Sequence, residues 1–128
     1  MKKRISLIFS SLLVLLIIFF SYITIGSLIY QTQNKIFYIF NYAIATTPTN
    51  SMDGNNGDSF GSGSIVLLTN TKYENLKIDD IIVYQDDFYG KLIIHRIVDE
   101  DELGFITKGD NEFDNDFGYV NKQTYQGK

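Results

Sequence analysis

The chain opens with an uninterrupted hydrophobic stretch that precedes every other feature of its pattern. Residues 5–30 contain no charged side chain, and Lys2, Lys3 and Arg4 stand immediately before them. As a helix, this stretch would be roughly 39 Å long at about 1.5 Å per residue, whereas the hydrocarbon core of a bilayer is about 30 Å thick. The pattern therefore predicts a transmembrane helix over residues 5–30 that crosses the bilayer with some tilt.

The basic residues at the start of this stretch predict its orientation. Positive charge is retained on the cytoplasmic side of a membrane, so residues 1–4 should be cytoplasmic and residues 31–128 should be exported. A cleaved signal peptide is the alternative, but its apolar core would span only about 7 to 15 residues, with small residues close behind it. Here an Ala-x-Ala sequence occurs only at Ala43–Ala45, well beyond the apolar end. We therefore expect an uncleaved, single-pass anchor in the cell membrane.

Short apolar segments separated by turn-forming residues make up the remainder. Four of them are rich in β-branched residues and predict strands, namely residues 64–69, 80–85, 91–98 and 104–110. Residues 36–44 are aromatic and β-branched, and they predict either a further strand or a segment at the membrane interface. No part after Tyr30 shows sustained helical periodicity. The predicted fold class is mainly β: an N-terminal transmembrane helix followed by a small β domain.

Polar connections are expected between these segments. Residues 46–64 are rich in Thr, Asn, Gly, Ser and Asp and predict a loop. Residues 86–90 predict a hairpin, and the acidic residues 99–104 predict an exposed connection. In residues 119–128 we expect no element that closes the sheet, as though a final strand or a second membrane segment were missing from the C-terminus.

Charge and cysteine content narrow the possible partners. The net charge is −4, the pI is near 4.8, and all 15 acidic residues follow the apolar stretch. An acidic domain lacks the basic face that binding to nucleic acid requires, so no nucleic-acid partner is expected. Because the chain has no cysteine, disulfides and zinc–thiolate sites are excluded.

One histidine is available for acid–base chemistry. His95 shares a strand face with Ile93 and Ile97 by the two-residue alternation of a strand. An imidazole on an apolar face stays neutral near pH 7, as a general base should. Ser51, within Thr47–Met52, is the serine that such a base could activate. A structural histidine and an ordinary turn serine are the alternatives that these residues leave open.

Several carboxylates follow the last predicted strand. Asp110, Asp114 or Asp116 could hold the imidazole in one tautomer and stabilise its charged form. A solvated acidic loop is the alternative. Asp114-x-Asp116-x-Gly118 also resembles part of a calcium loop, although it lacks the glutamate and the flanking helices of an EF-hand. The residues alone thus leave two classes of protein: an anchored β domain with a Ser-His-Asp set, and a non-enzymatic β module that binds a partner or calcium.

The order of these features resembles that of the type I signal peptidases. The apolar anchor is followed by Ser51-Met52, by Gly-x-Ile-Val at residues 63–66, by His-Arg-Ile-Val at residues 95–98, and by Thr-Lys-Gly-Asp-Asn at residues 107–111 with a further Asp. Within that family the chain is similar to the branch of the endoplasmic reticulum, archaea and some Gram-positive bacteria, in which histidine replaces the lysine base. The resemblance extends from the anchor to about Gly118.

This resemblance implies an activity and four catalytic positions. The activity is that of a membrane-anchored serine endopeptidase that removes signal peptides from exported preproteins. Ser51 would be the nucleophile and His95 the general base. Asp116 would orient His95, and Asp110 would be a supporting residue. No metal or organic cofactor is implied.

The resemblance also implies where the substrate binds. Thr49 and the Ser51 N–H would stabilise the oxyanion, and Met52 would lie beside the substrate. Substrates would carry small side chains at the first and third positions before the cut, selected by shallow apolar pockets lined from residues 36–44 and from around Met52 and Ile65. The implied partners are preproteins, the lipid bilayer and unidentified partner subunits.

Two departures from the family pattern concern the loop after the nucleophile. Asp53 is followed by Gly54 where the family usually has proline, and Ser64 stands where aspartate is usual. The connection over residues 53–64 is also longer and richer in glycine. Since a displacement of about 1 Å in the position of Ser51 can cost on the order of a hundredfold in rate, these departures leave an impaired or inactive relative as the alternative.

Overall fold

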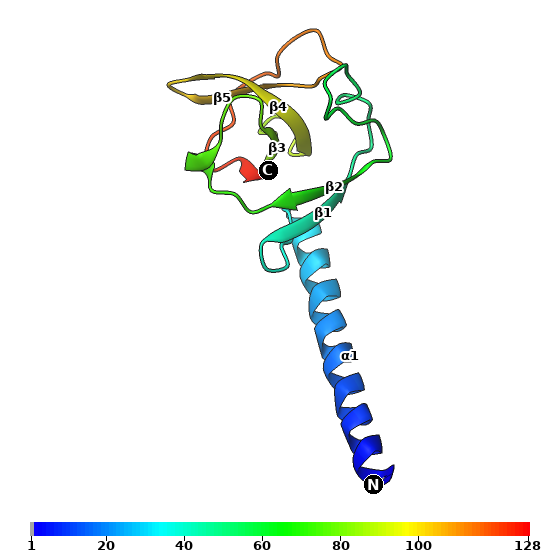
Figure 1. Ribbon diagram of the computed structural model, residues 1–128. Helices are drawn as coiled ribbons and strands as arrows, with labels where there is room; N and C mark the ends of the chain where they lie inside the picture. Colours follow the sequence, from blue (N-terminus) through cyan, green and yellow to red (C-terminus); the bar gives the residue numbers. More distant parts are fainter. Residues whose placement is uncertain (1) are drawn as a thin grey trace.

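One long helix and a small antiparallel β domain make up the molecule (Figure 1). The computed structural model describes the backbone of residues 2–128 and the side chains of residues 5–128. Helix α1 (Lys2–Thr32) is followed by β1 (Tyr42–Thr46), β2 (Ile65–Thr69), the 3₁₀ turn η1 (Tyr73–Asn75), β3 (Ile81–Gln85), β4 (Leu92–Asp101), β5 (Gly104–Lys108) and β6 (Tyr125–Gly127). The predicted fold class, a helix followed by a mainly β domain, is confirmed.

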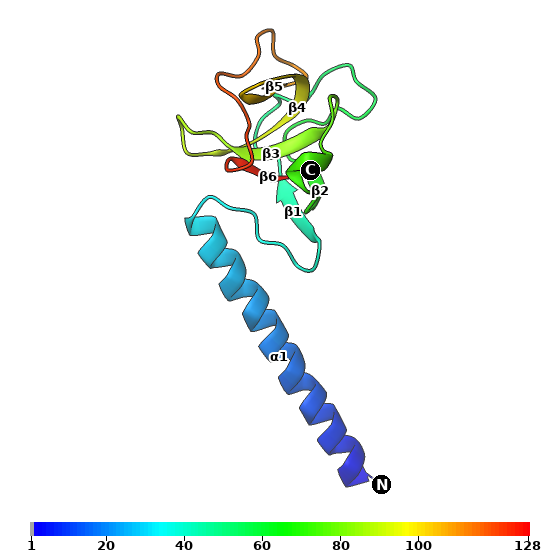
Figure 2. The same cartoon turned by 90° about the vertical axis from the view of Figure 1, so that its left-hand side faces the viewer.

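Helix α1 extends away from the domain (Figure 2). Residues Ile5–Thr32 are long and apolar enough to cross a membrane, and none of their most apolar window is buried within the protein. Side chains such as Leu7 and Phe9 are about 70% exposed. Water is a poor solvent for so much contiguous apolar surface, whereas hydrocarbon is a good one. The helix therefore suggests a membrane-anchored protein.

The segment between α1 and β1 turns back along the helix. The Phe37 ring packs against Tyr22 and Tyr30, with ring centroids 6.2 and 5.4 Å apart. Phe40 adopts a positive φ of 57°, which interrupts the extended conformation, and regular strand begins only at Tyr42. Of the two alternatives predicted for residues 36–44, a strand is therefore present only from Tyr42 onward.

The strands form two sheets. Strands β1 and β2 pair as a two-stranded antiparallel ribbon, and the other four form an antiparallel sheet in the order β5-β4-β3-β6. One face of the larger sheet buries an apolar cluster of Leu76, Ile82, Tyr84, Ile97, Phe105 and Val120. Its opposite face packs Val83 against Ala43 and Leu68 of the ribbon, so the ribbon and the sheet share a second cluster.

The four predicted strands and the hairpin over residues 86–90 are all present, with β4 longer than expected. Strand β4 continues to Asp101, so residues 99–101 are paired with β5 rather than part of a connection. Their acidic side chains are exposed. Strand prediction from sequence relies on alternating apolar residues, so this charged end of the strand could not be recognised.

The C-terminal segment closes the sheet, contrary to the expectation from sequence. Strand β6 pairs antiparallel with β3, and Lys128 exchanges two backbone hydrogen bonds with Thr69, the last residue of β2. The Tyr38 hydroxyl donates to the Gln126 carbonyl at 2.9 Å. Three residues are too few to show a strand period, so β6 depends on these long-range contacts rather than on local propensity.

Candidate active site

A histidine–aspartate pair lies at the centre of the site. Strand β4 presents His95, and its Nδ1 lies 2.6 Å from Asp116 Oδ2 in the loop after β5. The two side chains are 7% and 15% exposed. Because a carboxylate accepts hydrogen bonds, Nδ1 donates to Asp116, and in the neutral tautomer that this contact selects Nε2 keeps its lone pair.

Two further donors converge on the same carboxylate oxygen. Thr107 Oγ1 lies 2.7 Å and Tyr84 Oη 2.9 Å from Asp116 Oδ2. The sheet register explains the convergence, because it pairs Tyr84 with Ile93 and Thr107 with Ile97 and so puts both on the face that carries His95. Burial raises the pKa of the Asp116 carboxyl, but the hydrogen bonds from His95, Thr107 and Tyr84 outweigh burial and leave that pKa below its usual value.

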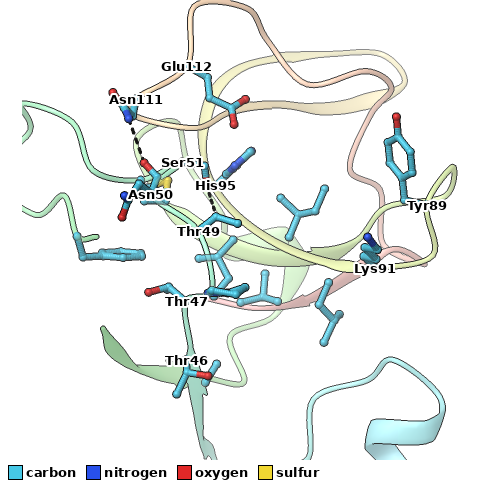
Figure 3. A pocket seen from close by; sticks show the side chains of 18 of the residues that line it. Thr46, Thr47, Thr49, Asn50, Ser51, Tyr89, Lys91, His95, Asn111 and Glu112 are labelled. Carbon is cyan, nitrogen blue, oxygen red and sulfur yellow. Dashed lines mark hydrogen bonds between the residues drawn. The ribbon is translucent and has the colours of Figure 1, made fainter. Parts of the chain in front are cut away.

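The loop before β2 brings Ser51 to the same place. Ser51 Oγ lies 3.2 Å from Thr49 Oγ1 (Figure 3), and the Asn111 N–H donates to the Ser51 carbonyl at 2.8 Å. The Ser51 carbonyl and His95 Nε2 both border Gly109, so closely that a Cβ on that glycine would lie 2.7 Å from the first and 3.0 Å from the second. Among the described residues, Ser51 Oγ makes no hydrogen bond to His95, and in the absence of a substrate such catalytic hydrogen bonds are often long.

A cavity of about 760 Å³ joins these side chains to an apolar surface. Its polar wall includes Thr49, Ser51, His95, Asn111 and Glu112 (Figure 3). The apolar wall comes from both sheets, the segment before β1 and the loop between β1 and β2. It includes Ile36, Ala45, Met52, Phe60, Val83, Leu92, Ile93 and Ile94. Of the residues considered from sequence for the lining of a substrate pocket, Met52 and Ile36 line this cavity, whereas residues 37–44 and Ile65 lie outside it, and Ile65 is 75% exposed.

Asp110 has a different partner from Asp116. Its carboxylate accepts hydrogen bonds from Arg96 Nε at 2.9 Å and from Arg96 Nη2 at 2.8 Å. The Arg96 guanidinium lowers the pKa of the Asp110 carboxyl to about 2, although burial opposes this shift. The structure thus places Asp116 against the imidazole and Asp110 against a guanidinium on the opposite face of β4.

The long loop over residues 53–64 is tied to this second ion pair. Asp58 binds the same guanidinium at 2.7 Å, and the Ser59 hydroxyl donates to Asp110 at 2.7 Å. A Cβ on Gly54 would lie 2.6 Å from the Asp110 carbonyl, so a proline at this position would collide with the loop that holds Asp110. The long loop, which had suggested an impaired relative as an alternative, is thus bonded to Arg96 and Asp110 through Asp58 and Ser59.

Sequence reasoning missed four residues that build the site: Tyr84, Thr107, Arg96 and Glu112. Tyr84 and Thr107 become recognisable only once the strand register is known, since nothing in their own neighbourhood marks them. Arg96 directly follows the histidine, so its side chain was expected on the opposite face of the strand, and this position could have indicated that it has a different partner from His95.

The calcium loop considered from sequence does not fit the geometry of these aspartates. Asp114 is exposed, whereas Asp116 accepts hydrogen bonds from three side chains of the domain interior. An oxygen-ligand loop would require both carboxylates to face one ion. Asp116 is already held by His95 and its neighbours.

A comparison with curated proteins found a similar protein. The chain is 38% identical over 80 residues to the signal peptidase complex catalytic subunit SEC11 of Eremothecium gossypii. The match covers 58% of this chain and 47% of that relative, so the chain spans about half of the relative's length. No protein-family model and no solved structure matches the chain. The similarity to this catalytic subunit supports a relationship with the signal peptidases.

Proposed function

We propose that this protein is a membrane-anchored serine endopeptidase that removes signal peptides from exported preproteins. The observation that carries the proposal is the contact of 2.6 Å between His95 Nδ1 and Asp116, on a cavity that Ser51 also lines. The partial similarity to a signal peptidase catalytic subunit supplies the substrate class.

In this mechanism Ser51 Oγ attacks the carbonyl carbon of the scissile peptide bond, and its proton passes to His95 Nε2. Asp116 stabilises the resulting imidazolium through Nδ1–H without taking the proton itself. The tetrahedral intermediate collapses when His95 returns the proton to the leaving amine, which leaves an acyl group on Ser51. A water molecule, deprotonated by His95, then hydrolyses this ester.

The oxyanion of the intermediate needs hydrogen-bond donors beside the nucleophile. The Ser51 N–H is one, and the Thr49 hydroxyl, 3.2 Å from Ser51 Oγ, is the other that we assign. Removal of one such donor costs about 2.7–4 kcal/mol of transition-state stabilisation in comparable enzymes. Thr49 thus acts on the rate of acylation rather than on substrate affinity.

The apolar wall of the cavity suits the end of a signal peptide. Ala45, Met52 and Val83 lie on that wall and present small or flexible apolar side chains to the residues before the cut. An extended peptide running from the nucleophile over this wall would place alternate side chains into it. We infer that this wall takes small side chains at the first and third positions before the scissile bond.

The outer face of the β1–β2 ribbon adds a second membrane contact in this proposal. Tyr42, Ile44, Ile65 and Leu67 share that face and are 54–75% exposed. The ribbon lies at the end of the domain nearest to α1 (Figure 1). We assign residues 1–4 to the cytoplasm, 5–30 to the plasma membrane and 31–128 to the outer side, where this face meets the lipid headgroups.

A processing assay tests the proposal directly. Membrane vesicles that contain the protein are incubated with a secretory precursor that has Ala at the first and third positions before the cut. The wild type should release the mature protein, and Ser51→Ala and His95→Ala should not, while both variants remain in the membrane fraction. Processing that survives Ser51→Ala would rule out the serine mechanism.

A wild type without activity would favour the two alternatives, an inactive relative or a non-enzymatic partner-binding module. A reactive fluorophosphonate probe distinguishes these two alternatives from an active enzyme that does not accept the chosen precursor. Labelling of the wild type but not of Ser51→Ala would show an activated serine even where the chosen precursor is not cleaved.

A further inference from the structure

The active-site cavity holds one carboxylate that the proposed mechanism does not use. Glu112 lines the cavity beside His95 (Figure 3), and its side chain is exposed. A hydrogen bond of 3.0 Å from its backbone N–H to the Gly109 carbonyl fixes its place in the chain. One possible ligand atom from each of His95, Glu112 and Asp116 lies within 4.8 Å of the other two.

His95 contributes a nitrogen that has no partner within the described part of the chain. The side chain is 7% exposed, and Asp116 occupies Nδ1. No described residue hydrogen bonds to Nε2. Every fully buried side-chain nitrogen or oxygen in the described residues has a partner, so Nε2 is not sealed in but reaches the cavity. A buried imidazole thus presents one free nitrogen to the cavity that Glu112 and Ser51 also line.

Asp116 stands where metal-binding histidines have their supporting group. A histidine that coordinates a metal through one nitrogen almost always donates its other N–H to a carboxylate or a carbonyl. That hydrogen bond fixes the tautomer and makes the coordinating nitrogen more basic. The contact of 2.6 Å from Nδ1 to Asp116 meets this requirement before any ion arrives.

We propose that this cavity binds Zn²⁺ through His95 Nε2 and the Glu112 carboxylate, and that the ion inhibits the enzyme reversibly. Binding stands on the geometry alone, whereas inhibition rests on the proposed function. The ion takes the lone pair of Nε2 that would accept the Ser51 proton, so it removes the general base. Asp116 orients the imidazole in both situations and does not coordinate the ion.

The donor set and its spacing favour zinc. Imidazole nitrogen and carboxylate oxygen bind Zn²⁺ at about 2.0–2.2 Å, which requires the two ligand atoms to come within roughly 3.5 Å of each other. Glu112 is exposed and can turn to close the remaining distance, while His95 stays fixed. Two protein ligands leave the other tetrahedral positions to water, so the binding is moderate and a chelator removes the ion.

Direct binding is tested on the full chain in detergent, purified without a polyhistidine tag, in the Ser51→Ala background. His95 is the only histidine, so any imidazole coordination reports on this site. Titration calorimetry with ZnCl₂ should give one site, and Co²⁺ should give the absorption of a tetrahedral ion. Glu112→Gln should weaken binding at least tenfold, and Asp116→Asn on the order of 10- to 100-fold. Asp114→Asn, an exposed acid of the same loop, should bind as the parent does.

Inhibition is tested on the active chain in the processing assay. Zn²⁺ should stop cleavage, EDTA should restore it, and Glu112→Gln, measured against its own uninhibited rate, should require at least tenfold more Zn²⁺. Equal Zn²⁺ binding by the parent and by Glu112→Gln would overturn the site. If Zn²⁺ binding depends on Glu112 but the chain cleaves no precursor, the zinc site is supported and the peptidase proposal fails. If the chain still cleaves precursor with Zn²⁺ bound, the proposed inhibition is overturned.

Discussion

Three hydrogen bonds converge on one oxygen of Asp116, and they decide which residue orients the imidazole. Asp116→Asn keeps the shape of the side chain but can present a donor to Nδ1, which would put the proton of the neutral ring on Nε2. In a comparable triad this substitution lowers kcat about 10⁴-fold. We expect a loss of that order in precursor cleavage, measured in single-turnover reactions.

Asp114→Asn is the matched control for this prediction. It removes a carboxylate from the same loop at an exposed position, so its rate should stay within about twofold of the wild type. An equal loss of rate in both variants would show that the charge of the loop matters rather than the contact with His95.

The ion pair of Arg96 with Asp110 makes stability depend on pH in a specific window. The pKa of the Asp110 carboxyl is about 2 in the folded protein, below that of an unfolded aspartate near 3.9. A lowered folded pKa means that the contribution is complete above about pH 4 and is lost as the pH falls through 2. The shift corresponds to about 2 kcal/mol of unfolding free energy.

The measurement is reversible unfolding in detergent at several pH values for the wild type and for Asp110→Asn. The advantage of the wild type should be constant from pH 7 to about pH 5 and should shrink by about 2 kcal/mol between pH 4 and pH 2. A difference that stays constant over that lower range would contradict the assignment.

At the scale of elements, β6 is held by a close approach that leaves no room for a side chain. A Cβ on Gly127 would overlap the Tyr38 hydroxyl, which is itself hydrogen bonded to Gln126. Gly127→Ala should therefore push β6 away from β3 and lower the unfolding free energy by about 1–3 kcal/mol. Gly57→Ala is the control, since nothing lies within 4 Å of a Cβ there. Thermal unfolding of the two variants makes the comparison, and equal midpoints would show that β6 is not clamped.

The elements that could be predicted from the sequence are those whose signal is local. The charge-free stretch predicts α1, and apolar β-branched runs predict β2 to β5. Strand β6 could not be predicted, because three residues that pair with β3 have no pattern of their own. The fastening of residues 53–64 was missed for the same reason: Asp58 meets Arg96 across 38 positions of the chain.

The candidate site likewise has a part that could be predicted from local sequence and a part that could not. The order of Ser51, His95 and Asp116 is visible in the sequence, because each stands in a short motif. The hydrogen bonds of Tyr84 and Thr107 with Asp116 depend on the register of three strands, and register is a property of the folded sheet.

At the scale of the whole molecule, the exposed face of the ribbon should lie in the membrane interface. The chain has no tryptophan, so a single introduced indole reports on one position. In nanodiscs with brominated lipids, Leu67→Trp should be quenched, because residue 67 is on the outer face of β2. Phe113→Trp, in the exposed loop after β5, should keep its fluorescence. Unquenched emission from the indole at position 67, equal to that at position 113, would show that the ribbon lies away from the lipid.

The chain turns back along α1 at Phe37, and this turn affects how far the domain lies from the membrane-spanning helix. Tyr22 lies about ten residues before the end of the helix, and its contact with Phe37 keeps the connection to the domain short and folded down. Under the proposed function, this contact would hold Ser51 at a fixed height above the bilayer and so fix the distance between the membrane and the cut. Lengthening the connection by a few Gly-Ser pairs would raise that height, and precursors would be cut farther from their hydrophobic segment.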